Sequence, residues 1–180
     1  MSKTCRLLFA GFGGQGILFA GKFLAYKGLI EDKQVSWLPS YGPEMRGGTA
    51  NCSVIISDEP IGSPIVDAPD VLIAMNLPSL EKYENAVVSG GKIFVDSTLI
   101  SKKVERDDVD VYYIPATQMA YDNNIKTLAN MIITGKVLKE VDGFSLDNVD
   151  AALKKVVSAR KIELLGVNET ALKSGYDYAE

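Results

Sequence analysis

A glycine-rich stretch, GFGGQG at residues 11–16, stands between a short apolar run and a longer amphipathic one, and this placement constrains the fold most strongly. The run RLLFA, residues 6–10, is too short for a helix and is flanked by turn formers, which predicts a buried strand. Residues 15–30 carry apolar side chains at helical spacing, which predicts a helix packed on a sheet. A strand, a glycine turn and a helix in this order indicate an α/β fold.

The same alternation continues along the chain. Further strands are predicted at residues 34–38, 49–57, 71–75, 92–96 and 109–114, and a short helix from Pro78 through Ala86. Beyond Ala116 the spacing is helical; Ser145 and Asn168 are expected to cap two later helices, and Gly175 to interrupt the last. We therefore predict a single α/β domain over residues 1–180, with α/β/α layers and a largely parallel or mixed sheet.

Composition excludes several kinds of active site. The 180 residues include no histidine, so the chain supplies no imidazole base, catalytic triad or imidazole metal ligand. Cys5 and Cys52 lie far apart in apolar stretches, which excludes a disulfide framework, a zinc site and an iron–sulfur cluster held by this chain. The net charge of −4 gives no general attraction to nucleic acid or anionic lipid, and no apolar run is long enough to span a membrane. We expect no catalytic or metal-ligating residue, no nucleic-acid or membrane partner, and a cytoplasmic location.

The glycine-rich loop suits a phosphate-bearing ligand. It satisfies Gly-x-Gly-x-x-Gly, and free backbone N–H groups at a helix N-terminus attract phosphate. An NAD site also needs an acidic residue at the end of the second strand, where the sequence is Leu38-Pro39-Ser40-Tyr41, so nicotinamide binding is disfavoured. The same glycines could instead serve only close packing of strand and helix, and the sequence leaves both interpretations open.

A second glycine-bearing loop, SYGPEMRGG at residues 40–48, has Arg46 as its only cation. Arg46 could bind phosphate or carboxylate, or anchor a partner chain, with Gly47 and Gly48 permitting close backbone approach. Alternatively, Glu44 and Arg46 form a solvated ion pair that contributes about 0–1 kcal/mol. Both interpretations remain open at this point.

Five segments in a fixed order resemble the gamma subunits, or gamma domains, of 2-oxoacid:ferredoxin oxidoreductases. They are GFGGQGIL, SYGPEMRGGTANCSVIIS, IGSPIVDAPDVLIAMN, GGKIFVDS and ANMIITGKVL, and they extend to Leu138. The length is most similar to the gamma chain of the 2-oxoglutarate or branched-chain type, although the pyruvate and indolepyruvate enzymes use a similar domain.

This resemblance implies one part of an enzyme that converts a 2-oxoacid and coenzyme A to acyl-CoA and carbon dioxide, passing electrons to ferredoxin. It implies thiamine diphosphate and magnesium between alpha and beta subunits, and iron–sulfur clusters on the beta subunit or a ferredoxin-like delta subunit. Since gamma domains are associated with the coenzyme A side, it implies phosphate contact by Gly11, Gly13, Gly14, Gln15, Gly16 and Arg46. It likewise implies interface roles for Tyr41, Glu44, Gly47 and Gly48.

The remaining residues agree with a chain that depends on partners. It lacks a Gly-Asp-Gly motif followed by an asparagine pair for thiamine diphosphate. Asn76, Asp96 and Asn130 are interpreted as structural side chains that hydrogen-bond backbone groups. Two alternatives stay open. A stand-alone nucleotide- or phosphate-ligand-binding protein would bind a dinucleotide tightly by itself, and a purely structural brace would show no effect of loop substitutions beyond assembly.

Overall fold

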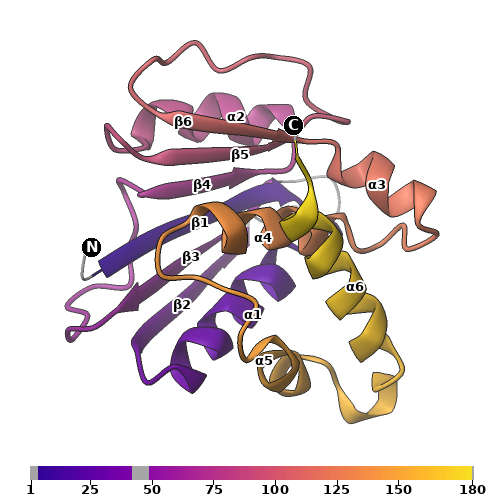
Figure 1. Ribbon diagram of the computed structural model, residues 1–180. Coiled ribbons are helices and arrows are strands. Elements are labelled where there is room, and N and C mark those ends of the chain that lie inside the picture. Colours follow the sequence, from indigo (N-terminus) through magenta and orange to yellow (C-terminus); the bar gives the residue numbers. More distant parts are fainter. Residues whose placement is uncertain (1–3, 42–48, 180) are drawn as a thin grey trace.

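The computed structural model describes residues 4–41 and 49–179, which form one six-stranded sheet with helices on both faces (Figure 1). The strands are β1 (Thr4–Phe12), β2 (Gln34–Tyr41), β3 (Thr49–Ser57), β4 (Val71–Ala74), β5 (Lys92–Asp96) and β6 (Asp110–Ile114). Their order in the sheet is β2-β3-β1-β4-β5-β6. Neighbours from β1 to β6 are parallel, whereas β3 is antiparallel to both β1 and β2. The predicted α/β fold with a mixed sheet is confirmed.

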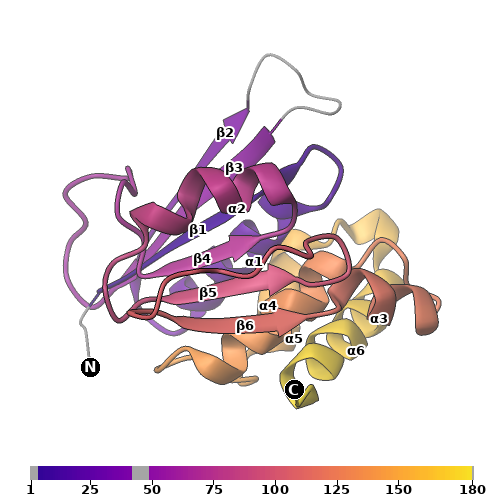
Figure 2. The ribbon, with the colours of Figure 1, turned by 90° about the horizontal axis from the view of Figure 1, so that it is seen from above.

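The helices divide between the two faces of the sheet. They are α1 (Ile17–Ile30), α2 (Leu77–Tyr83), α3 (Ala116–Asp122), α4 (Ala129–Glu140), α5 (Val149–Val156) and α6 (Leu164–Asp177), with short 3₁₀ turns η1 (Glu84–Ala86) and η2 (Ala159–Lys161). Successive residues of β1 point to opposite faces. Leu7 and Phe9 pack with the buried residues of α1 and α4–α6, and Leu8 packs with Leu80 of α2. Figure 2 shows α2 on the side of the sheet opposite to α4, α5 and α6. This arrangement confirms the predicted three layers.

Helices α4 and α6 cross in backbone contact at two glycines. A Cβ atom at Gly175 would lie 1.7 Å from the Ile132 carbonyl oxygen, and one at Gly135 would lie 1.9 Å from the Leu172 oxygen. Helix α6 continues through Gly175 to Asp177, so the prediction that this glycine interrupts the helix was wrong. Packing against α4 outweighs the cost of glycine in a helix, about 1 kcal/mol.

The two expected helix caps were also wrong. The residue that precedes α5 is Asn148, with φ 60°, and its side chain caps nothing. The Ser145 hydroxyl instead donates to the Asp147 carboxylate and accepts the Asp147 N–H, which makes a local turn. Asn168 lies inside α6, where its Nδ2 donates to the Leu164 carbonyl. Both side chains bond nearby backbone groups, but not at the helix start.

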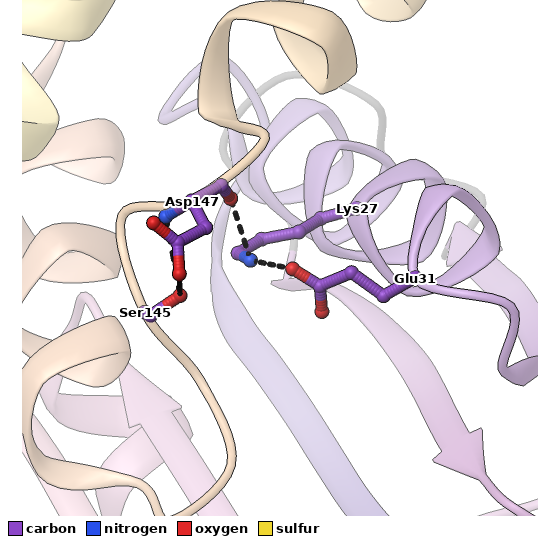
Figure 3. A network of polar contacts seen from close by, with 4 residues as sticks. All are labelled: Lys27, Glu31, Ser145 and Asp147. Carbon is purple, nitrogen blue, oxygen red and sulfur yellow. Dashed lines mark hydrogen bonds and ion pairs between the residues drawn. The ribbon is translucent and has the colours of Figure 1, made fainter.

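A buried lysine ties the C-terminal end of α1 to the connection between α4 and α5 (Figure 3). Lys27 is 1% exposed, pairs with Glu31, and donates to the Asp147 carbonyl oxygen at 2.9 Å. A buried ammonium is stable only when such partners replace water. Within residues 4–41 and 49–179, no helix has the length and apolar character that crossing a membrane requires.

Candidate functional site

The glycine-rich loop lies at the edge where the parallel strands end (Figure 2). It joins β1 to α1, on one face of the sheet, whereas β4, the parallel neighbour of β1, leads to α2 on the opposite face. Connections that leave neighbouring strands toward opposite faces create a crevice outside their carboxyl ends. In open α/β sheets this crevice is the usual position of a ligand.

Backbone geometry explains three glycines of the loop. Gly14 and Gly16 have φ values of 97° and 76°, in the left-handed region that favours glycine. A Cβ atom at Gly11 would lie 2.6 Å from Oε1 of Gln15 and 2.7 Å from Cδ1 of Ile17. The turn itself therefore favours glycine at Gly14 and Gly16, whereas at Gly11 a side chain would displace the ends of the Gln15 and Ile17 side chains.

The loop presents unpaired backbone N–H groups at the start of α1. Gly16 precedes the helix without a side-chain cap, and no acidic residue occupies the first turn. The first helical bond runs from the Ala20 N–H to the Gly16 carbonyl, at 3.0 Å. The N–H groups of Ile17, Leu18 and Phe19 consequently have no acceptor within the described part of the chain. With the positive end of the helix dipole, they form a site suited to an anion.

Two amide side chains fix this loop from different sides. Gln15 accepts the Phe12 N–H at 2.6 Å through Oε1, and donates from Nε2 to the Met75 carbonyl, at the end of β4, at 2.8 Å. Asn130, on α4, donates from Nδ2 to the Gly16 carbonyl at 3.0 Å. Sequence reasoning had no signal for the Gln15–Met75 and Asn130–Gly16 bonds, because these partners lie 60 and 114 positions apart.

The three polar residues interpreted as structural do bond backbone groups, which confirms that interpretation. Asn76 caps α2 by accepting the Ser79 N–H, and Asp96 accepts from the N–H groups of Thr98 and Thr117. However, Nδ2 of Asn76 and Oδ1 of Asn130 are buried without a partner among the residues described. Ser79 Oγ, Trp37 Nε1 and Asn168 Oδ1 are likewise buried without a partner in the described chain, so this feature is not specific to the loop.

The predicted residues of the second loop, Glu44, Arg46, Gly47 and Gly48, lie outside the described residues. Tyr41 is the last residue of β2, and only its backbone is described. Thr49, the first residue of β3, pairs with Phe12, the last residue of β1. The ends of the strands that flank residues 42–48 are therefore at the same edge as the glycine-rich loop.

The chemistry of the remaining polar groups is structural. Burial raises the pKa of Cys5 and of Cys52 to about 12, which disfavours the thiolate form that binds metals. In residues 4–41 and 49–179, no group of three or more acidic or cysteine side chains could hold a metal ion. A cavity of about 380 Å³ lies at the opposite edge of the sheet, where Lys33 pairs with Asp58 and Lys92 with Asp110. The glycine-rich loop is the candidate site because it joins free helix N–H groups to the carboxyl ends of the parallel strands.

A mixed sheet flanked by helices, with free helix N–H groups after a glycine-rich loop, defines an α/β domain with a potential anion site. The chain belongs to the pyruvate ferredoxin/flavodoxin oxidoreductase family, whose model matches residues 6–178. It is 38% identical over 175 residues to the ketoisovalerate oxidoreductase subunit VorA of Methanothermobacter thermautotrophicus, covering 97% of this chain but 36% of that one. It is 35% identical to the 2-oxoglutarate synthase subunit KorC of Methanocaldococcus jannaschii, covering all of this chain and 95% of that one.

Solved structures share the fold. The gamma subunit of a keto/oxoacid ferredoxin oxidoreductase from Geobacter sulfurreducens matches with a TM-score of 0.84 and 27% identity, covering 97% of this chain and 95% of that one. The 2-oxoglutarate:ferredoxin oxidoreductase of Magnetococcus marinus, solved with 2-oxoglutarate, coenzyme A and succinyl-CoA bound, matches with a TM-score of 0.87 and 24% identity, covering 98% of this chain and 31% of that one. The chain thus spans about a third of some relatives and nearly all of others.

Proposed function

We propose that this chain is the gamma subunit, or gamma domain, of a 2-oxoacid:ferredoxin oxidoreductase. The enzyme would oxidatively decarboxylate 2-oxoglutarate or a branched-chain 2-oxoacid to the acyl-CoA and pass the electrons to ferredoxin. Support comes from the family and from relatives named for ketoisovalerate and for 2-oxoglutarate. The chain contributes no catalytic side chain in this proposal.

The part assigned to this chain is to bind the phosphate groups of coenzyme A. The observation that carries this assignment is the open start of α1, where the first N–H groups lack acceptors and no acidic side chain competes for them. A diphosphate fits this donor set, because backbone N–H groups at a helix N-terminus and a glycine loop bind phosphate oxygens. Gly13, Gly14 and Gly16 let the ligand approach the backbone closely, and Arg46 would add a guanidinium donor.

Partner chains would supply the reacting groups. Thiamine diphosphate with magnesium would lie between alpha and beta subunits and would stabilise the carbanion left by decarboxylation. Iron–sulfur clusters on the beta or a ferredoxin-like delta subunit would carry the electrons. Neither cysteine of this chain suits a cluster, since burial raises both thiol pKa values. We place the assembled enzyme in the cytoplasm.

An apolar rim beside the glycine loop supports a protein interface at the same edge. Phe12, Leu77 and Leu99 follow or end the adjacent strands β1, β4 and β5, and they are 38%, 38% and 48% exposed. Exposed apolar side chains next to a ligand site are typical of a surface that a partner covers. We propose that the alpha and beta subunits contact this rim together with Tyr41, Glu44, Gly47 and Gly48.

The test is substitution of Arg46 in the assembled enzyme. Arg46→Ala is expected to raise the KM for coenzyme A by about ten- to a hundredfold, since loss of a charge-assisted contact to phosphate costs about 1.5–3 kcal/mol. Decarboxylation of the 2-oxoacid should remain intact. Arg160→Ala removes the same charge from η2 and should change neither value. Loss of assembly on a sizing column would assign Arg46 to the interface, and tight binding of NAD or FAD by the isolated chain would favour a stand-alone nucleotide-binding protein.

A further inference from the structure

We propose that Asn130 and Gln15 are positioning residues that hold the N–H groups at the start of α1 in the geometry needed to bind phosphate. This inference rests on the ligand role of the glycine-rich loop proposed above. It extends the site to a side chain on α4, which no pattern in the loop itself indicates.

Asn130 fixes the orientation of the peptide group between Gly16 and Ile17. Its Nδ2 donates to the Gly16 carbonyl oxygen at 3.0 Å, and the same oxygen accepts the Ala20 N–H at 3.0 Å. A peptide group is planar and trans, so its N–H points opposite to its C=O. With the oxygen held toward Asn130 and the helix, the Ile17 N–H is directed away from the helix and toward the loop.

The asparagine has little freedom to move. It is 2% exposed, and a Cβ atom at Gly16 would lie 2.5 Å from its Nδ2, so the amide packs directly against the loop backbone. Its Oδ1 is buried without a donor among the described residues. The one bond that this amide makes in the described chain is therefore the bond from Nδ2 to the Gly16 carbonyl.

Gln15 holds the other side of the loop. Its side chain spans from the Phe12 N–H, at 2.6 Å, to the Met75 carbonyl, at 2.8 Å, and its own N–H bonds the Phe12 carbonyl at 3.2 Å. These bonds fasten the loop to the ends of β1 and β4. The Gln15 side chain therefore acts through the backbone of the loop, and the phosphate is contacted by the neighbouring N–H groups.

Two neutral substitutions test this inference in the assembled enzyme. Asn130→Leu and Gln15→Met remove the hydrogen bonds at similar side-chain size and without charge. Each is expected to raise the KM for coenzyme A about tenfold, with kcat and the KM for the 2-oxoacid unchanged. Hydrogen exchange gives a readout independent of turnover: coenzyme A should protect the backbone N–H groups of residues 13–19 in the wild type, and much less in either variant.

Asn168→Leu is the matched control. Asn168 is also 2% exposed, donates from Nδ2 to a helix carbonyl, and has a buried Oδ1 without a partner in the described chain. It lies on α6, and neither the loop nor helices α1 and α4 include it. Its substitution should leave the KM for coenzyme A and the exchange protection unchanged, and an effect equal to that of Asn130→Leu would overturn the positioning role.

Gly14→Ala separates failure of this inference from failure of the proposed function. A Cβ atom there meets nothing within 4 Å, but the φ of 97° strains the loop directly. If Gly14→Ala raises the KM for coenzyme A while Asn130→Leu and Gln15→Met do not, the loop binds the ligand and the positioning inference is wrong. If none of the three changes KM or protection, the loop is not the coenzyme A site. Should Asn130→Leu fail to assemble, Gln15→Met decides on the same readouts.

Discussion

The two ends of helix α1 differ in whether the rest of the described chain supplies partners for their polar groups. At the C-terminal end, the buried Lys27 pairs with Glu31 and donates to the Asp147 carbonyl at 2.9 Å (Figure 3). At the N-terminal end, Gly16 offers no side-chain cap, and the first N–H groups find no acceptor in the residues described. Side-chain contacts within the described chain therefore stabilise the C-terminal end, whereas the N–H groups at the N-terminal end have no such partner.

This difference distinguishes a structural end from a ligand-binding end. A cation in the last turn compensates the negative pole of the helix, as Lys27 does. No acidic side chain compensates the positive pole in the first turn. The chain instead uses Gln15 and Asn130 to hold carbonyl and N–H groups of the loop in place. Supporting the backbone while leaving helix N–H groups unpaired is the arrangement expected for binding an external anion.

The largest effect is expected from disturbing the helix crossing that supports Asn130. Gly175→Ala would place a methyl group 1.7 Å from the Ile132 carbonyl oxygen of α4. We expect the free energy of unfolding, measured with urea, to fall by about 3 kcal/mol, because overpacking of backbone against backbone forces the helices apart. Gly166→Ala, also in α6 but with nothing within 4 Å, should raise it by about 0.5–1 kcal/mol. Equal stability of the two variants would show that the crossing is not tight.

A smaller effect is expected at the C-terminal end of α1, where Lys27 lies. Lys27→Met keeps the length of the side chain but removes the ion pair with Glu31 and leaves the Asp147 carbonyl without this donor. We expect the free energy of unfolding to fall by about 2 kcal/mol, with the KM for coenzyme A unchanged. Lys154→Met removes an exposed pair with Asp150 at the same helical spacing and should cost under about 0.5 kcal/mol. An altered KM in Lys27→Met without loss of stability would contradict the division between the two ends.

The third effect depends on pH and concerns the two thiols, one of which, Cys52, lies beside the N-terminal end of α1. Cys52 Sγ is 3.6 Å from the Ile17 carbonyl, and burial raises the pKa of Cys52 and of Cys5 from 9.0 to about 12. The unfolded chain therefore releases thiol protons at lower pH than the folded one. Their contribution to stability is complete well below pH 9 and is lost progressively as the pH rises toward 12.

Urea unfolding between pH 9 and 11 measures this contribution. Lysines also titrate in this range, so the comparison is with the double variant Cys5→Ala and Cys52→Ala, in which the loss of stability per pH unit should be smaller. A double variant with the same pH dependence as the wild type would show that the thiols are not protonated and buried as the structure indicates.

Local patterns were sufficient to predict most of the fold. The run at residues 49–57 was predicted as a strand with its observed bounds, because alternating apolar residues between turn formers specify a strand locally. The position of the glycine loop between β1 and α1 followed from the same periodicity. Family membership then followed from several motifs in order, which is more specific than a single glycine loop.

Features that depend on distant partners could not be predicted. Gly175 was expected to end a helix because its contact, Ile132, lies on another helix. Ser145 and Asn168 were expected at helix starts because their side chains can cap, but each bonds a different nearby group. The bond from Asn130 to Gly16 joins residues 114 positions apart, and no local pattern encodes it. The phosphate contact itself stays a prediction.

Hydrogen exchange of the assembled enzyme, with coenzyme A and with pantetheine, tests the central claim most directly. Pantetheine keeps the thiol arm but lacks the phosphate groups and the adenosine, and 4′-phosphopantetheine restores one phosphate without the adenosine. Coenzyme A should slow exchange of the N–H groups of residues 13–19, and pantetheine should not. Neither ligand should affect exchange at residues 27–33, around the C-terminal end of α1. Binding of coenzyme A with unchanged exchange at residues 13–19 would contradict a phosphate site at the start of α1.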